Sequence, residues 1–132
     1  MTTPPVPPTA PTPLDPGLLS LATARLRYSE RRTAILAQDV ANADTPGFVA
    51  RDLRGFSSIL RSIPLAPAAG TSIPAAQAVA NAHRVVGPMT PDGNAVDVEQ
   101  TLARLATTDS AQRLASELYS KYLGFYRTAV GR

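Results

Sequence analysis

The sequence has few of the residue types on which catalytic and metal sites depend. Cysteine is absent, and His83 is the only histidine among 132 residues. Without cysteine there can be no disulfide, no thiolate metal site and no cysteine nucleophile. A site built on His83 would need further ligands or paired carboxylates around it, and the acidic residues are scattered along the chain. We therefore expect no enzyme, no cofactor and no metal site.

Long apolar runs and strong charge of one sign are also missing. No stretch approaches the roughly 18 apolar residues that a membrane-spanning helix requires, so we expect no direct membrane span. The first residues, MTTPPVPPTAPTPLDP, have neither a basic region nor an apolar core, and they do not predict a secretory signal peptide. The net charge is only +3. Nucleic-acid-binding proteins usually gather more positive charge on one face, so we expect no nucleic-acid partner.

The arginines between residues 25 and 32 form a basic patch on a predicted helix. Glu30 and Asp39 lie among these charges, which favours a solvated helix face or ion pairs between subunits over a nucleic-acid surface. The candidates for ion pairs between subunits are Arg25, Arg31, Arg51 and Asp52.

Proline marks the first segment boundaries. Residues 1–14 hold six prolines and predict a flexible, disordered tail, or alternatively a ligand for a proline-binding partner. Asp15 can cap a helix and Pro16 suits its first turn, which predicts an N-terminal helix over residues 15–45. Pro46 ends this helix because proline cannot donate the next backbone hydrogen bond.

Residues 46–95 have no sustained apolar period. Their scattered proline and glycine predict a turn followed by an extended, largely irregular loop. Within it the stretch 78–86 allows short strands, and Pro91-Asp92-Gly93 predicts a second turn.

Residues 96–132 predict a second long helix, which Asp97 caps and in which the weak helix formers at 107–110 predict a bend. Both long helices carry apolar residues at helical spacing. We therefore predict an all-α fold in which they pair as a coiled-coil-like hairpin. Apolar surface lies on more than one side of each helix, so helices of other subunits are needed to cover it. The predicted packing residues are Leu19, Leu26, Leu36, Val40, Leu102, Leu105, Leu114, Leu118, Tyr122, Phe125 and Tyr126.

The stretch LAQDVANADTPGFVARDL, residues 36–53, predicts a rigid corner. Pro46 and Gly47 fit the central positions of a type II turn, in which glycine accepts a positive φ. Asn42 and Asp44 are placed to bond backbone groups where the helix frays. The residues of this predicted turn are Ala41, Asn42, Asp44, Thr45, Pro46, Gly47 and Phe48.

Two stretches carry a resemblance to a known family. ANADTPGFVARDL, residues 41–53, resembles the signature of bacterial flagellar basal-body rod proteins, in which a helix ends in Ala-Asn-x-x-Thr-Pro-Gly-aromatic. It is most similar to the FlgB branch, which belongs to the proximal rod. The stretch that starts GNAVDVEQ at Gly93 is similar to the C-terminal end of that branch, where Gly-Asn-x-Val-Asp leads into a long helix. The proline-rich extension, Phe48 in place of tyrosine, and Gln100-Thr101 depart from the pattern.

The resemblance implies a structural subunit that polymerises helically and transmits torque from the MS-ring to the distal rod and hook. It implies export through the flagellar type III apparatus without a cleaved signal peptide, and a place in the periplasmic rod. The implied partners are other copies of the chain, FlgC, FlgF, the MS-ring and its adaptor FliE. Termini that order only on docking would suit such export, so we expect an isolated monomer with partly disordered termini.

Two alternatives stay open at this point. The chain could be another proximal-rod protein such as FlgC, or a small basic helical module that binds nucleic acid.

Overall fold

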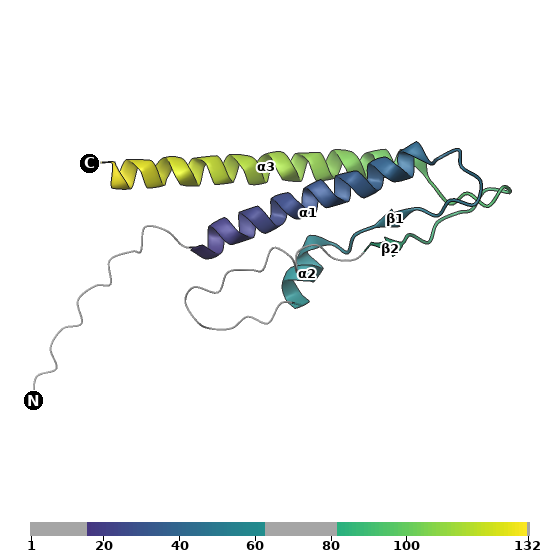
Figure 1. The fold of residues 1–132 in the computed structure, drawn as a ribbon, viewed down its shortest axis with the longest axis horizontal. Helices are drawn as coiled ribbons and strands as arrows, with labels where there is room; N and C mark the ends of the chain where they lie inside the picture. The colour runs from purple at the N-terminus through teal and green to yellow at the C-terminus, as the bar shows by residue number, and fades with distance from the viewer. Residues whose placement is uncertain (1–15, 63–81, 132) are drawn as a thin grey trace, which may run out of the picture.

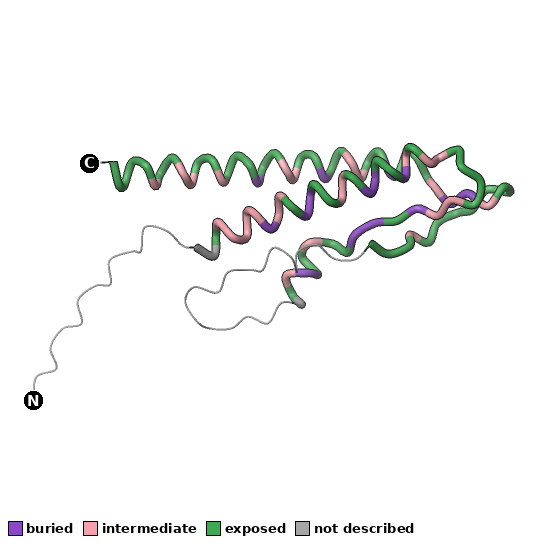
Figure 2. The backbone as a smooth tube through the Cα atoms, in the orientation of Figure 1, coloured by how far each residue is buried: buried purple, intermediate pink, exposed green. Residues whose placement is uncertain are grey.

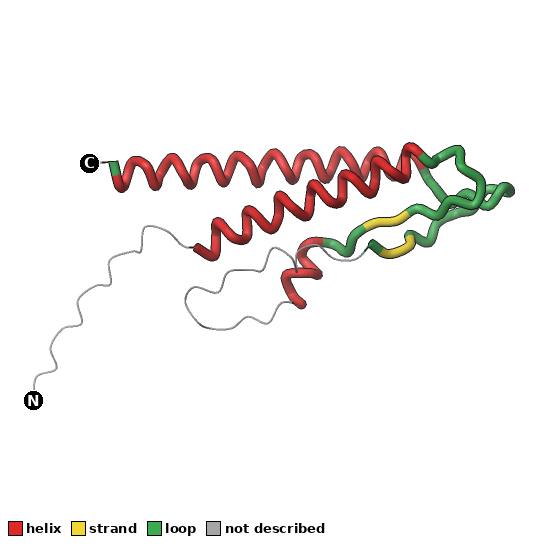
Figure 3. The backbone as a smooth tube through the Cα atoms, in the orientation of Figure 1, coloured by secondary structure: helices red, strands yellow, loops and turns green. Residues whose placement is uncertain are grey.

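The computed structural model describes residues 16–62 and 82–131. The predicted proline-rich tail, the Asp15 cap and much of the predicted loop lie outside these residues. Two long helices dominate the described part, and the shorter elements lie between them in the sequence (Figures 1 and 3). The elements in chain order are α1 (Pro16–Ala41), β1 (Arg51–Asp52), α2 (Phe56–Ser62), β2 (His83–Arg84) and α3 (Val98–Val130).

Helices α1 and α3 pack against each other and run in opposite directions. They meet where α1 ends and α3 begins, and α3 extends past the start of α1 (Figure 1). This confirms the predicted hairpin of terminal helices. Asp97 caps α3 as predicted, because its carboxylate accepts a hydrogen bond of 2.9 Å from the Gln100 N–H. The helix is continuous through 107–110, where the sequence predicted a bend.

Small side chains form the α3 side of this pairing. The buried residues of α3 are Thr101, Thr108 and Ala115, spaced seven residues apart as in a coiled-coil seam. The two buried hydroxyls are satisfied inside the helix, since Thr101 donates to the Asp97 carbonyl (2.7 Å) and Thr108 to the Arg104 carbonyl (2.8 Å). Buried positions follow α1 and the segment around β1, whereas α3 is mainly exposed (Figure 2).

A separate apolar cluster lies between α1, β1 and α2. It joins Tyr28, Ile35, Leu53 and Ile59, with Phe56 packed against it. The centres of the Tyr28 and Phe56 rings lie 5.3 Å apart. The Tyr28 hydroxyl donates to the Arg54 carbonyl at 2.9 Å. This contact holds a short helix, α2, where the sequence predicted irregular chain.

The two short strands pair antiparallel. Arg51 lies opposite Arg84, and Asp52 lies opposite His83. Strand β2 falls inside the stretch 78–86, where the sequence allowed short strands, but β1 was not predicted. The pairing continues one step further, because the Val85 N–H donates to the Ala50 carbonyl at 2.9 Å.

Candidate functional site

The candidate site is the corner at which the chain leaves α1 and later enters α3. Its first part is the turn Thr45–Phe48. The Phe48 N–H donates to the Thr45 carbonyl at 3.2 Å, and Gly47 has a φ of +72°. Both features are those of the predicted type II turn with proline and glycine at its centre.

The polar residues around this turn have different roles. Asn42 bonds the fraying helix end as predicted, since its side-chain amide donates to the Gln38 carbonyl at 2.8 Å. Its carbonyl oxygen also accepts from the Thr45 hydroxyl at 3.3 Å. Asp44 is exposed, and no hydrogen bond joins its carboxylate to the described residues, so the predicted backbone bond of Asp44 is not formed.

The second part of the corner is the turn Thr90–Gly93, which the sequence also predicted. The Gly93 N–H donates to the Thr90 carbonyl at 2.9 Å, and Gly93 has a φ of +80°. Buried Asn94 follows it and accepts the Val96 N–H at 2.8 Å through its side-chain oxygen. The turn is thereby joined directly to the cap of α3.

The two turns bind each other. The Gly47 N–H donates to the Asp92 carbonyl at 3.2 Å, and the Ala95 N–H donates to the Phe48 carbonyl at 3.0 Å. The side-chain amide of Asn94 donates to the Ala43 carbonyl. Sequence reasoning found each turn but not their contact. The available signal was an asparagine directly after a turn glycine, a residue type that often bonds nearby backbone.

An ion pair joins α1 to β1. The Arg32 guanidinium donates to both carboxylate oxygens of Asp52, at 2.8 and 2.7 Å, and Arg104 approaches the carboxylate at 3.8 Å. Asp52 is therefore paired inside the chain, which corrects our expectation of an ion pair between subunits. Burial alone would raise the pKa of Asp52. The hydrogen bond and charge of Arg32, with the Leu53 N–H and Arg104, outweigh burial and hold that pKa below its usual range.

Asp39 is buried without such a partner. Its carboxylate accepts the Arg51 N–H at 3.0 Å, which ties α1 to β1. Burial raises the pKa of Asp39 above its usual range, because this hydrogen bond offsets only part of the desolvation.

The other predicted intersubunit cations lie in different settings. The Arg25 guanidinium lies 4.8 Å from the centre of the Phe56 ring and 5.4 Å from that of Tyr28, so its charge faces two rings of its own chain. Arg31 and Arg51 are exposed side chains. They line one cleft, and their exposed side chains remain available to a neighbour.

An apolar groove of about 370 Å³ runs between α1, α2 and α3. Leu18 and Leu21 of α1, Phe56 and Leu60 of α2, and Leu114, Leu118 and the alanines beside them line it. Several predicted packing residues are largely exposed in the single chain. The exposed fractions are 51% for Leu102, 58% for Leu114, 56% for Leu118 and 75% for Phe125.

The remaining predicted packing residues are covered to different degrees. Leu36 is fully buried. Half-buried positions are Leu19, Leu26, Val40, Leu105, Tyr122 and Tyr126. The chain therefore covers its α1 stripe better than its α3 stripe, and it leaves several large side chains of α3 exposed.

Within residues 16–62 and 82–131, no three histidine or acidic side chains are grouped so that they could hold a metal ion. The helices described there are not apolar enough over a sufficient length to cross a membrane. Neither a scan against models of known protein families nor a search of curated proteins finds a match to the chain.

Proposed function

We propose that the chain is a structural subunit of the bacterial flagellar proximal rod, of the FlgB type. The observation that carries the proposal is the contact between the two stretches that resemble rod proteins. Residues 41–53 and the start of the stretch at Gly93 are joined at one corner by two hydrogen bonds, from the Ala95 N–H to the Phe48 carbonyl and from the Asn94 amide to the Ala43 carbonyl. A third, from the Gly47 N–H, reaches Asp92 directly before that stretch. A motif whose polar residues bond backbone has a geometric role, which suits a structural subunit better than a catalytic one.

The uncovered face of α3 supports assembly. Leu114, Leu118 and Phe125 are each more than half exposed, and an apolar groove lies beside the first two. Contiguous exposed apolar surface is a feature of interaction sites. In the proposal, helices of neighbouring subunits cover this face, and the corner fixes the angle between the helices and the β1–β2 sheet.

In this proposal the subunits polymerise helically in the periplasm and transmit torque from the MS-ring to the distal rod and hook. Contacts between unlike surfaces do not close into a ring unless the rotation allows it, and they generate helical assemblies. The partners are other copies of the chain, FlgC, FlgF, and the MS-ring with FliE, after export through the flagellar type III apparatus.

Substitution of the uncovered face tests the proposal. The double variant L114D/L118D places two charges where neighbours would pack, and it should abolish swimming while export of the subunit continues. Ser116, an exposed polar residue of the same helix turns, gives the control S116D, which should swim. Normal swimming of L114D/L118D would contradict the packing role. In a strain that lacks the gene, a rod that starts normally at its base and stops at a later subunit would favour the FlgC alternative.

A further inference from the structure

A basic cleft lies beside the β1–β2 sheet and has a volume of about 600 Å³. Its charged lining consists of four arginines, Arg32, Arg54, Arg84 and Arg104, against a single carboxylate, Asp52, which gives a net charge of +3. The cleft thus holds as much net positive charge as the entire chain. This concentration of charge is local, and the overall composition does not reveal it.

Two of these arginines are unneutralised by the described part of the chain. Asp52 is occupied by Arg32 and Arg104, and no described carboxylate pairs with exposed Arg54 or Arg84. Arg84 also lies directly opposite Arg51 across the two strands. Like charges opposite each other destabilise a strand pair, so an anionic partner would relieve a repulsion built into the sheet.

The corner of the molecule has the opposite charge. The stretches 41–50 and 85–103 contain no arginine or lysine. Their acidic residues are Asp44, Asp92, Asp97 and Glu99, all of them exposed. We call these four residues the acidic corner. The segments between α1 and β1 and between β2 and α3, which contain the two turns, lie at one end of the molecule (Figure 1).

We infer that the basic cleft of one copy receives the acidic corner of a second copy. The inference rests on the proposed function, because it assigns a contact to the self-assembly proposed there. Complementary charge sets the orientation and register of such contacts. Since the cleft and the corner are different surfaces of one chain, the contact is head-to-tail and leaves a free corner and a free cleft on every dimer. Such a contact propagates to an open helical assembly when the rotation between copies does not close a ring.

Two full-length variants test the inference. The cleft variant R54E/R84E keeps the native corner, and the corner variant D44R/E99R keeps the native cleft. These four side chains lie outside the Arg32–Asp52 pair and the hydrogen bonds of the two turns, and the Tyr28 bond to residue 54 uses only its backbone. Circular dichroism of each variant verifies that the helices are retained.

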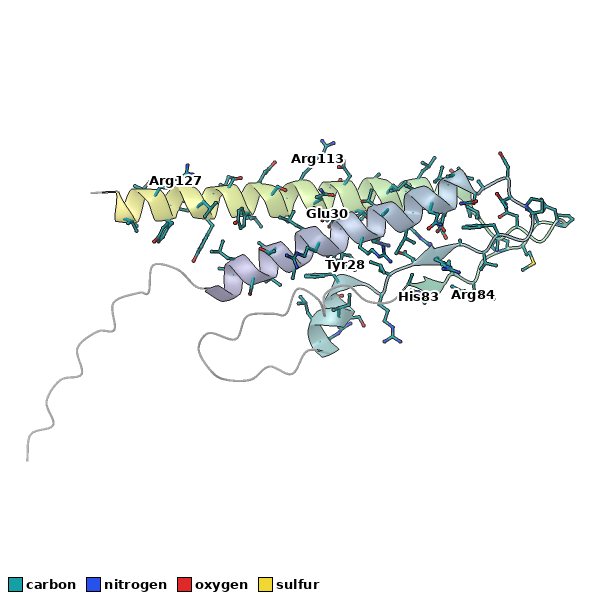
Figure 4. All side chains as sticks on the ribbon, in the orientation of Figure 1. Tyr28, Glu30, His83, Arg84, Arg113 and Arg127 are labelled. Carbon is teal, nitrogen blue, oxygen red and sulfur yellow. The ribbon has the colours of Figure 1, made fainter. Side chains whose placement is uncertain are left out.

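At protein concentrations high enough for the original chain to associate, each variant alone should associate roughly tenfold or more weakly in sedimentation experiments at low salt. An equimolar mixture should form a one-to-one complex, since the native corner of the first variant fits the native cleft of the second. That complex should weaken as salt rises. The control R113E/R127E changes the charge equally but on α3, at the opposite side of the molecule from His83 and Arg84, and should associate like the original chain (Figure 4).

Three results would overturn the inference. The first is self-association of R54E/R84E or D44R/E99R at the original strength. If L114D/L118D abolished association in the same experiment, the rod proposal would stand without the cleft contact. The second is the absence of a complex in the mixture of folded variants at the highest soluble concentration. The third combines two observations: a single-stranded oligonucleotide binds the original chain tightly but not R54E/R84E, and the two mixed variants do not bind each other. This result would assign the cleft to nucleic acid.

Discussion

The side-chain amide of Asn94 donates a hydrogen bond to the carbonyl of Ala43, a residue 51 positions earlier in the sequence. Asn94 also accepts the Val96 N–H at 2.8 Å, and it is only 4% exposed. One side chain therefore joins the end of α1 to the start of α3. Because its amide and carbonyl oxygen are both used, no other residue type of similar size can replace it fully.

Asn94→Ala should open the corner. It removes the hydrogen bonds of the half-buried Ala43 carbonyl and Val96 N–H, at a cost of about 0.5–1.5 kcal/mol for each bond. Hydrogen exchange at the Ala95 amide, which donates to the Phe48 carbonyl, reports this opening. Asn42→Ala removes a bond of a less buried asparagine and should have a smaller effect. Equal protection of Ala95 in N94A and the original chain would contradict the role of Asn94.

The two turn glycines should tolerate β-branched side chains poorly. Gly47→Val imposes a β-branched residue on a φ of +72°, although open space surrounds the position, and should cost about 1–2 kcal/mol or more. Gly124→Ala is the matched control, because Gly124 lies inside α3 with open space around it. That change should increase helix stability by up to about 1 kcal/mol. Thermal melts followed by circular dichroism compare the two, and a neutral G47V would contradict the turn geometry.

Asp52→Asn should destabilise the contact between α1 and β1 at neutral pH, and it should destabilise this contact less in acid. Burial raises the pKa of Asp52, but the Arg32 pair outweighs this and lowers it overall. A lowered folded-state pKa means that the ion pair stabilises above the usual aspartate value of about 4 and loses this effect as the pH falls below it. The expected loss at pH 7 is about 1–3 kcal/mol, measured by hydrogen exchange at the Val85 amide. A loss that stays constant down to strong acid would rule out this origin.

Asp39→Asn should behave in the opposite way. Burial raises the pKa of Asp39, so the folded state favours the neutral carboxyl, and stability is lost as the pH rises through the folded-state pKa. Asparagine keeps an oxygen that can accept the Arg51 N–H and removes the buried charge. Protection of Val85 at pH 7 should therefore be equal to or greater than that of the original chain. A loss as large as that of D52N would contradict this assignment.

Substitutions in the two stripes of α3 should separate folding from assembly. Leu114→Gln changes a residue that is 58% exposed, and it should leave helix stability almost unchanged while it weakens association. Ala115→Leu overfills the buried seam and should cost about 1–3 kcal/mol of stability. Thermal melts and sedimentation of both variants make the comparison. Destabilisation by L114Q as large as that by A115L would place Leu114 inside the single-chain core.

The sequence was sufficient to predict those elements whose signal lies in a few neighbouring residues. The turn at Gly47 and the Asp97 cap each depend on a few neighbouring residues, and the structure has both. The predicted helix extended to residue 45, whereas α1 ends at Ala41 and turns occupy the residues from there to Pro46, where the Asn42 side chain bonds the Gln38 carbonyl. Helix α2 was missed because seven residues show no clear period, and its position depends on the contact of Phe56 with distant Tyr28.

Contacts between distant residues were not predictable in this way. The Arg32–Asp52 pair joins residues 20 positions apart, and nothing near either residue marks the other as its partner. The apolar pattern of α3 also pointed to its leucines as the seam. Small residues such as Thr108 and Ala115 occupy the seam instead and leave Leu114 and Leu118 outside. Sequence spacing identifies the stripes, but it does not decide which stripe packs within the chain.

Electron microscopy of basal bodies from a strain that lacks this gene tests the rod proposal most directly. The account predicts that the null strain does not swim and that its basal bodies end at the MS-ring without a rod. A plasmid copy of the original gene should restore both, whereas the L114D/L118D copy should restore neither although its product is exported. A null strain that swims and builds complete rods would contradict the account.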